Sequence, residues 1–152
     1  MTDDVRLAAV EDRLDGIETI LAVTGGKGGV GKSFVASALA LVWALEGRRV
    51  GLLDLDFTSP STHVILGYET RFPAEEWGIE PIEHHGIRCM SIAHFAGETP
   101  VPLRGADGTD ALLELLTITR WGELDRLVVD MPPGLGDAAL DAIRWLHRAE
   151  YL

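Results

Sequence analysis

Short apolar runs alternate along the chain with stretches of helical periodicity. The apolar runs lack a polar face, which is typical of parallel strands buried on both sides, and they fall at 20–23, 50–55, 87–92 and 127–129. Apolar residues spaced three and four apart predict helices at 3–18, 32–46, 109–116 and 138–147. Gly47 is placed to close the second helix in left-handed geometry, and Thr109 to cap the third.

This order of elements predicts an α/β fold with a mainly parallel sheet and helices on both faces. The segment 57–86 is rich in Pro, Gly, Ser and Thr and has little periodicity. We expect loops there, with one or two short helices. The acidic helix at the N-terminus is expected to be a packing arm.

Length and charge narrow the class of protein. The 152 residues fit one domain, and no apolar run approaches the roughly 20 residues that span a bilayer. The N-terminus lacks the basic and apolar regions of a signal peptide, so we expect a cytoplasmic protein. A net charge of −11 argues against nucleic acid or an anionic membrane as partner.

The stretch 26–33, GKGGVGKS, fits the phosphate-loop pattern GxxxxGK[ST] and lies between an apolar run and a helix. Its backbone N–H groups would converge on phosphate oxygens, Lys32 would neutralise the β and γ phosphates, and Ser33 would coordinate Mg²⁺. ATP and Mg²⁺ are therefore the predicted cofactors. The predicted nucleotide contacts are Gly26, Lys27, Gly28, Gly29, Val30, Gly31, Lys32, Ser33 and Phe34.

Three aspartates follow the apolar runs that would carry them to the same edge of the sheet. Asp130 ends the fourth run, where a carboxylate holds Mg²⁺ through water in phosphate-loop proteins. Asp54 and Asp56 alternate at the end of the second run and should have different roles. We predict that Asp56 orients the attacking water and that Asp54 supports the Mg²⁺ shell; a purely structural role for one of them stays open.

Lys27 gives the loop a second lysine, in the sequence KGGVGK, and this variant resembles the deviant Walker A motif of the MinD, ParA and Mrp group of ATPases. In that group the early lysine reaches across a dimer interface to the partner's nucleotide. The resemblance therefore implies a homodimer, with Lys27 acting in catalysis beside Lys32 and Asp56.

Further motifs are similar to the Mrp branch of the group, over roughly residues 17–152. They are GLLDLD at 51–56, SPS at 59–61, LG at 66–67, MSI at 90–92, RG at 104–105, WGELD at 121–125, VDMPPG at 129–134 and GD at 136–137. The resemblance implies a dimeric P-loop ATPase that carries or scaffolds iron–sulfur clusters and delivers them to apo client proteins. It also matches Arg104 to a family arginine that contacts nucleotide or partner, a surface salt bridge being the alternative.

The sequence departs from this family at two places. Ser59 stands where the family has a glycine before its Pro-Ser turn. The C-terminal C-x-x-C that would bridge a cluster between subunits is absent, so the chain looks truncated at its C-terminus and supplies no iron–sulfur ligand. We expect a helical arm at 1–19, a partial P-loop nucleotide-binding domain at 20–152, and a cluster only in a longer parent protein.

The lone cysteine, Cys89, cannot form an intrachain disulfide or by itself a metal site, and the five histidines show no metal-ligand spacing. Two other functions remain open. One is a non-catalytic nucleotide-binding module that regulates or binds a partner. The other is a ParA- or MinD-like positioning ATPase, which would require a basic patch to bind DNA or a C-terminal amphipathic helix to bind a membrane.

Overall fold

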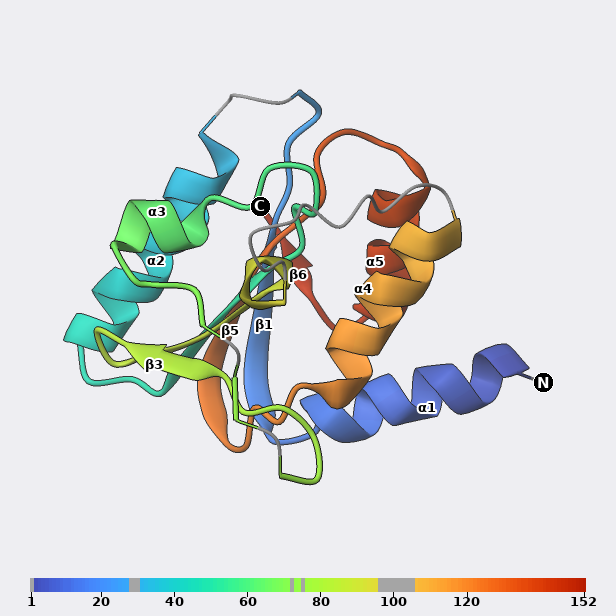
Figure 1. Ribbon diagram of the computed structural model, residues 1–152, viewed down its shortest axis with the longest axis horizontal. Coiled ribbons are helices and arrows are strands. Elements are labelled where there is room, and N and C mark those ends of the chain that lie inside the picture. The colour runs from blue at the N-terminus through green and yellow to red at the C-terminus, as the bar shows by residue number, and fades with distance from the viewer. Residues whose placement is uncertain (1, 28–30, 72, 75, 96–105) are drawn as a thin grey trace.

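The computed structural model describes residues 2–27, 31–71, 73–74, 76–95 and 106–152, and Figure 1 shows its layers. The helices are α1 (Thr2–Leu14), α2 (Lys32–Leu45), α3 (Thr62–Leu66), the single-turn η1 (Ile92–His94), α4 (Ala106–Ile118) and α5 (Asp137–Trp145). The strands are β1 (Ile17–Val23), β2 (Val50–Asp54), β3 (Ile82–His84), β4 (Ile87–Ser91), β5 (Leu124–Asp130) and β6 (Glu150–Tyr151). No helix among the described residues is long and apolar enough to cross a membrane.

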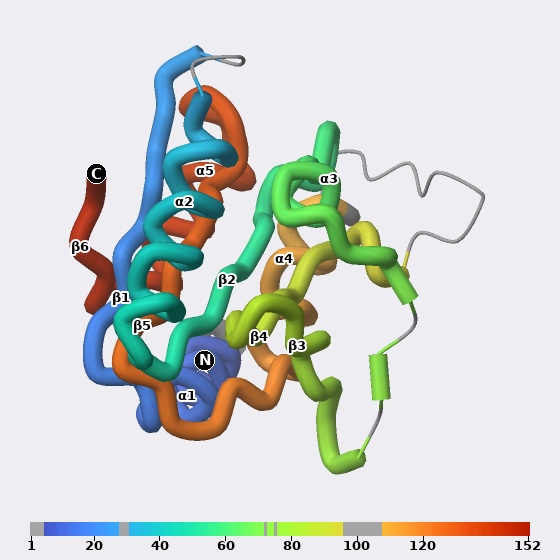
Figure 2. The backbone as a smooth tube through the Cα atoms, turned by 90° about the vertical axis from the view of Figure 1, so that its left-hand side faces the viewer, coloured from blue at the N-terminus to red at the C-terminus, as the bar shows by residue number. Residues whose placement is uncertain are grey.

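The strands form one sheet in the order β3-β4-β2-β5-β1-β6, with β3 and β6 at opposite edges (Figure 2). Every pairing is parallel except that of β3 with β4, so the prediction of a mainly parallel sheet is confirmed. The antiparallel pair is a hairpin joined by His85 and Gly86, both with positive φ. Two such residues are typical of a tight turn that matches the twist of the strands.

Helices cover both faces of the sheet, as predicted. Neighbouring residues of β2 and of β5 belong to opposite hydrophobic clusters: Leu53 and Val129 pack in the cluster with α1, α4 and α5, and Leu52 and Val128 in the cluster with α2. Figure 1 shows α1, α4 and α5 on one side of the strands, and α2 and α3 on the other. Strands buried on both sides need apolar residues at every position, and this is why they appear as continuous runs.

Several sequence predictions of element boundaries are wrong. The first helix ends at Leu14, and Ile17 and Glu18 already belong to β1. Burial explains the difference, because Ile17 and Ile20 both lie in the core. The division of the chain at 19/20 into an arm and a domain stays a prediction.

Thr109 does not cap α4. It lies inside the helix, which begins at Ala106, and its hydroxyl donates to Asp141 Oδ2 of α5 at 2.9 Å. The strand β5 begins at Leu124, earlier than the expected 127, since residues 124–126 pair with β1. The left-handed Gly47 after α2 (φ 82°) and the short helix α3 confirm two further predictions. The segment 57–86 also contains the strand β3, which was not predicted, and β4 ends at Ser91 because Ile92 begins η1.

Strand register positions the functional residues. Within the sheet Val23 of β1 lies opposite Asp130 of β5, and Asp130 lies opposite Asp54 of β2. The phosphate loop leaves β1 directly after this level. The carboxyl ends of three adjacent parallel strands thus deliver the loop and two aspartates to one edge.

The turn between α1 and β1 provides a test of packing. A Cβ built on Gly16 would lie 2.8 Å from the backbone oxygen of Gly122, whereas one on Gly108 in α4 meets nothing within 4 Å. We expect Gly16→Ala to lower the free energy of unfolding by about 1–3 kcal/mol, because backbone atoms must move. The matched control Gly108→Ala should leave it unchanged or raise it by up to about 1 kcal/mol. Urea denaturation of both variants measures the difference, and equal stabilities would contradict the overlap at Gly16.

Candidate nucleotide-binding site

The phosphate-loop sequence leads into the N-terminus of α2. Gly31 has φ 88°, a left-handed conformation that suits glycine, and its carbonyl accepts from Val35 N at 2.9 Å. Lys32 is the first residue of the helix, so the free backbone N–H groups of this turn face the site. Gly28, Gly29 and Val30 lie outside the described residues, and their phosphate contacts stay predictions, as does the role of Arg104.

A cavity of about 460 Å³ opens at this helix end. Its walls are Lys27, Gly31, Lys32, Ser33, Phe34, Asp56, Thr58, Ser59, Ser61, Ile65 and Pro133. It unites predicted site residues from the phosphate loop, from α2 and from the segment after β2. Gly26 lines an adjacent apolar cavity of about 410 Å³ with Tyr151 and Leu135.

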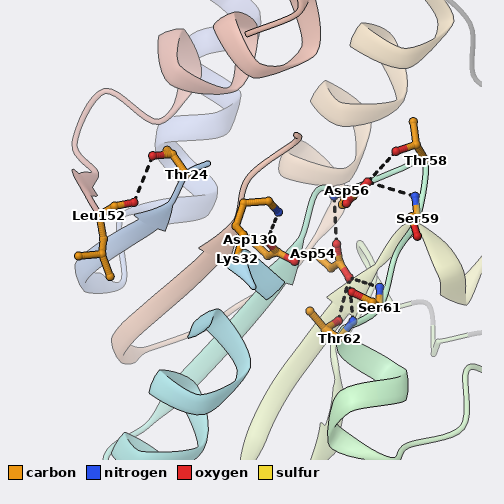
Figure 3. Close-up of polar contacts among 10 residues, drawn as sticks. All are labelled: Thr24, Lys32, Asp54, Asp56, Thr58, Ser59, Ser61, Thr62, Asp130 and Leu152. Atoms are coloured by element: carbon orange, nitrogen blue, oxygen red, sulfur yellow. Dashed lines mark hydrogen bonds and ion pairs between the residues drawn. The ribbon is translucent and has the colours of Figure 1, made fainter. Parts of the chain in front are cut away.

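Lys32 and Asp130 form a buried ion pair between Nζ and Oδ1 (Figure 3). The other carboxylate oxygen, Asp130 Oδ2, is buried and has no hydrogen-bond partner among the described residues. A buried carboxylate oxygen without a donor is costly, and a hydrated cation would satisfy it. Asp130 therefore has an oxygen suited to a cation, and Ser33 lines the cavity at the start of α2.

Asp54 is fully buried, and its carboxylate accepts four hydrogen bonds (Figure 3). Oδ1 accepts from Asp56 N at 3.0 Å, and Oδ2 accepts from Ser61 N at 3.2 Å, Thr62 N at 3.2 Å and Thr62 Oγ1 at 2.9 Å. Burial and the neighbouring Asp130 carboxylate raise the pKa of Asp54 to about 6, and the hydrogen bonds act in the opposite direction.

Asp56 lies on the cavity wall, in a turn that its own carboxylate stabilises. Its Oδ1 accepts from Thr58 Oγ1 at 2.9 Å and from Ser59 N at 3.1 Å. These bonds leave Oδ2 with no hydrogen bond from the protein in the described part of the chain. The arrangement agrees with a group that would face a water molecule, and the role of Asp56 stays a prediction.

Sequence analysis missed Thr62 and Tyr68. Thr62 is fully buried and Tyr68 nearly so, and their hydroxyl oxygens lie 3.5 Å apart next to Asp54. The only signal was a Ser-Thr pair before a short apolar stretch, which is typical of a helix start. Nothing in the sequence shows that a buried aspartate is the partner.

Cys89 lies in β4 and is fully buried, and burial raises the pKa of its thiol to about 12. A thiol in such surroundings is protonated and inert. Within the described ranges no group of three or more His, Cys, Asp or Glu side chains is arranged to hold a metal ion.

Solved structures with the same fold include nucleotide-binding proteins. A nucleotide-binding protein of Archaeoglobus fulgidus, solved in complex with ADP, superposes with a TM-score of 0.82 and 36% sequence identity over 95% of this chain and 57% of that one. The septum site-determining protein MinD of Pyrococcus horikoshii has a TM-score of 0.53 at 18% identity, which shows a common fold alone.

Curated relatives are named iron–sulfur cluster carrier proteins. The Pseudomonas fragi protein is 46% identical over 132 residues, covering 84% of this chain and 46% of its own length. The Escherichia coli K12 protein is 43% identical over 130 residues, covering 84% of this chain and 35% of its own. This chain thus spans half or less of the length of these relatives. The family described as ParA: NUBPL iron-transfer P-loop NTPase matches residues 16–152, and the chain belongs to that family.

Proposed function

We propose that this chain binds ATP with Mg²⁺ and hydrolyses it. One observation supports the proposal above others: the cavity at the N-terminus of α2 gathers Lys27, Lys32, Ser33 and Asp56 from separate segments. A cavity with two ammonium groups, a hydroxyl and a carboxylate provides the parts that phosphoryl transfer to water requires.

Each residue has a distinct part in this proposal. Lys32 leaves Asp130 to meet the β and γ phosphates, and Ser33 and Asp130 hold the Mg²⁺, which would neutralise phosphate charge. Asp56 orients the attacking water, and Lys27 reaches the nucleotide of a second copy in a homodimer. Phe34 and the loop backbone complete the predicted contacts. For Asp54, the four hydrogen bonds from the following segment favour a structural role over the predicted support of the Mg²⁺ shell.

We further propose that the chain is the nucleotide-binding part of an iron–sulfur cluster carrier that serves apo client proteins in the cytoplasm. The names of its relatives support the proposal. Cys89 is unsuited to hold the cluster because its thiol is buried and protonated. Cluster ligands would have to come from a longer protein, through a C-x-x-C.

Removal of the Lys32 ammonium tests nucleotide binding. We expect Lys32→Ala and the bulkier Lys32→Met to lose measurable binding of Mg-ATP, because the phosphate charge then lacks its main side-chain partner. Isothermal titration calorimetry measures the affinity, and circular dichroism verifies the fold. Arg48→Ala is the control, since this arginine pairs with Glu46 at the surface, at the far end of α2 from the site. Wild-type affinity in both lysine variants would refute the proposed site.

Asp56→Asn separates binding from hydrolysis. We expect ATP affinity to be retained and single-turnover hydrolysis to fall by about 10²- to 10⁴-fold, the usual effect of losing a general base or water-orienting group. Glu46→Gln, a surface change of the same kind, should leave both quantities unaltered. If hydrolysis by Asp56→Asn equals that of the wild type, Asp56 has no such role.

The Lys32–Asp130 ion pair predicts that Asp130→Asn changes ATP affinity in opposite directions with and without Mg²⁺. Asp130→Asn frees Lys32 and removes a negative charge next to the phosphates, so ATP should bind about tenfold more tightly in EDTA. In excess Mg²⁺ the same variant should bind more weakly than wild type, because a carboxylate that holds the cation is lost. Titrations in the two buffers measure both effects. Weaker binding in EDTA as well would show that the ion pair does not compete with phosphate.

A further inference from the structure

The segment between β2 and α3 forms one wall of the cavity, and a single buried carboxylate holds both of its ends. Asp56, Thr58, Ser59 and Ser61 all lie on this wall. At its start Asp56 N donates to Asp54 Oδ1, and at its end Ser61 N and Thr62 N donate to Asp54 Oδ2. Asp54 therefore closes residues 56–62 into a loop.

The hydrogen bonds of Asp54 leave little capacity for a metal. A carboxylate offers about two lone-pair sites on each oxygen, and the loop donates three hydrogen bonds to Asp54 Oδ2 and one to Oδ1. Asp130, by contrast, has an oxygen without a donor. The two aspartates are thus suited to different tasks.

The loop end is anchored to the protein core through Thr62. Its hydroxyl donates to Asp54 Oδ2 at 2.9 Å and lies 3.5 Å from the hydroxyl of Tyr68. Tyr68 is buried and packs between rings on the β3–β4 side, with centroids 5.5 Å from His84 and 5.8 Å from His94. A left-handed Gly67 after α3 turns the chain back so that Tyr68 can reach this position.

We propose that Asp54 and Thr62 are positioning residues, a clamp that fixes the loop 56–62 so that Asp56 faces the phosphate site. The inference rests on the proposed hydrolysis and adds to it the device that holds its water-orienting group. The clamp acts through Asp56 and touches neither the phosphates nor the metal. Its loss should therefore affect the rate of hydrolysis and the order of the loop, and leave ligand affinities as they are.

The clamp can be tested by removing one hydroxyl. Thr62→Val keeps the shape of the side chain and loses the donor to Asp54, whereas Thr62→Ser keeps the donor. Thr70→Val is the matched control, because Thr70 is exposed. In the full chain we would measure single-turnover ATP hydrolysis, the Mg²⁺ concentration at half-maximal rate, ATP affinity, and amide hydrogen exchange of Asp56, Ser61 and Thr62.

We expect Thr62→Val to lower hydrolysis about tenfold, the worth of one hydrogen bond to a charged acceptor, and to speed exchange of the three amides by a similar factor. ATP affinity and the Mg²⁺ requirement should stay within about twofold of wild type. Thr62→Ser should restore hydrolysis and exchange, and Thr70→Val should change neither.

Three results would overturn the inference: unchanged exchange in Thr62→Val, faster exchange with unchanged hydrolysis, or a raised Mg²⁺ requirement in that variant. Absence of hydrolysis by the wild-type chain would instead count against the proposed function. In that case the exchange rates alone decide whether the clamp exists, since they are measured without nucleotide.

Discussion

The parallel register of β1, β5 and β2 is the constraint on which the site depends. It aligns Val23, Asp130 and Asp54 at one level of the sheet, where each strand ends. A shift of one residue would turn the side chain of Asp130 to the opposite face and move it away from Lys32. The apolar clusters on both faces resist such a shift, because successive residues such as Leu52 and Leu53 of β2, or Val128 and Val129 of β5, belong to opposite clusters.

Charge is concentrated at this level of the sheet. Two buried carboxylates and one buried ammonium lie together, and they are balanced in different ways. One oxygen of Asp130 pairs with the Lys32 ammonium, and the other has no donor among the described residues. Asp54 accepts hydrogen bonds from three backbone N–H groups and a hydroxyl of the described residues. The negative charge that remains suits a divalent cation. A bound phosphate could replace Asp130 as the partner of the Lys32 ammonium.

The same edge of the sheet carries residues on regular elements and a residue on a loop. Asp130 and Asp54 end strands in the core, and Lys32 begins a helix packed on the sheet. Asp56 stands on a loop that depends on side-chain hydrogen bonds for its shape. Because Asp56 is predicted to orient the attacking water, the order of this loop would be a point of control over the proposed hydrolysis.

The sequence by itself determined the parts of the protein whose physics is local. The phosphate loop, the strands buried on both faces and the left-handed Gly47 are each specified by neighbouring residues, and the family resemblance rested on such motifs. The sequence did not predict β3, because a three-residue strand paired across His85 and Gly86 has too few residues for a periodic pattern.

Tertiary structure decided which groups meet. Lys32 and Asp130 are 98 positions apart, and only the sheet register and the packing of α2 bring their charges together. The Asp54 clamp needs the turn after β2, the short helix α3 and the return of Tyr68 at once. A linear pattern shows a carboxylate at a strand end but not its donors, because the donors come from the folding of the following segment. This is why the sequence placed Asp54, Asp56 and Asp130 at one edge and predicted roles for them, but left open whether Asp54 or Asp56 has a structural role.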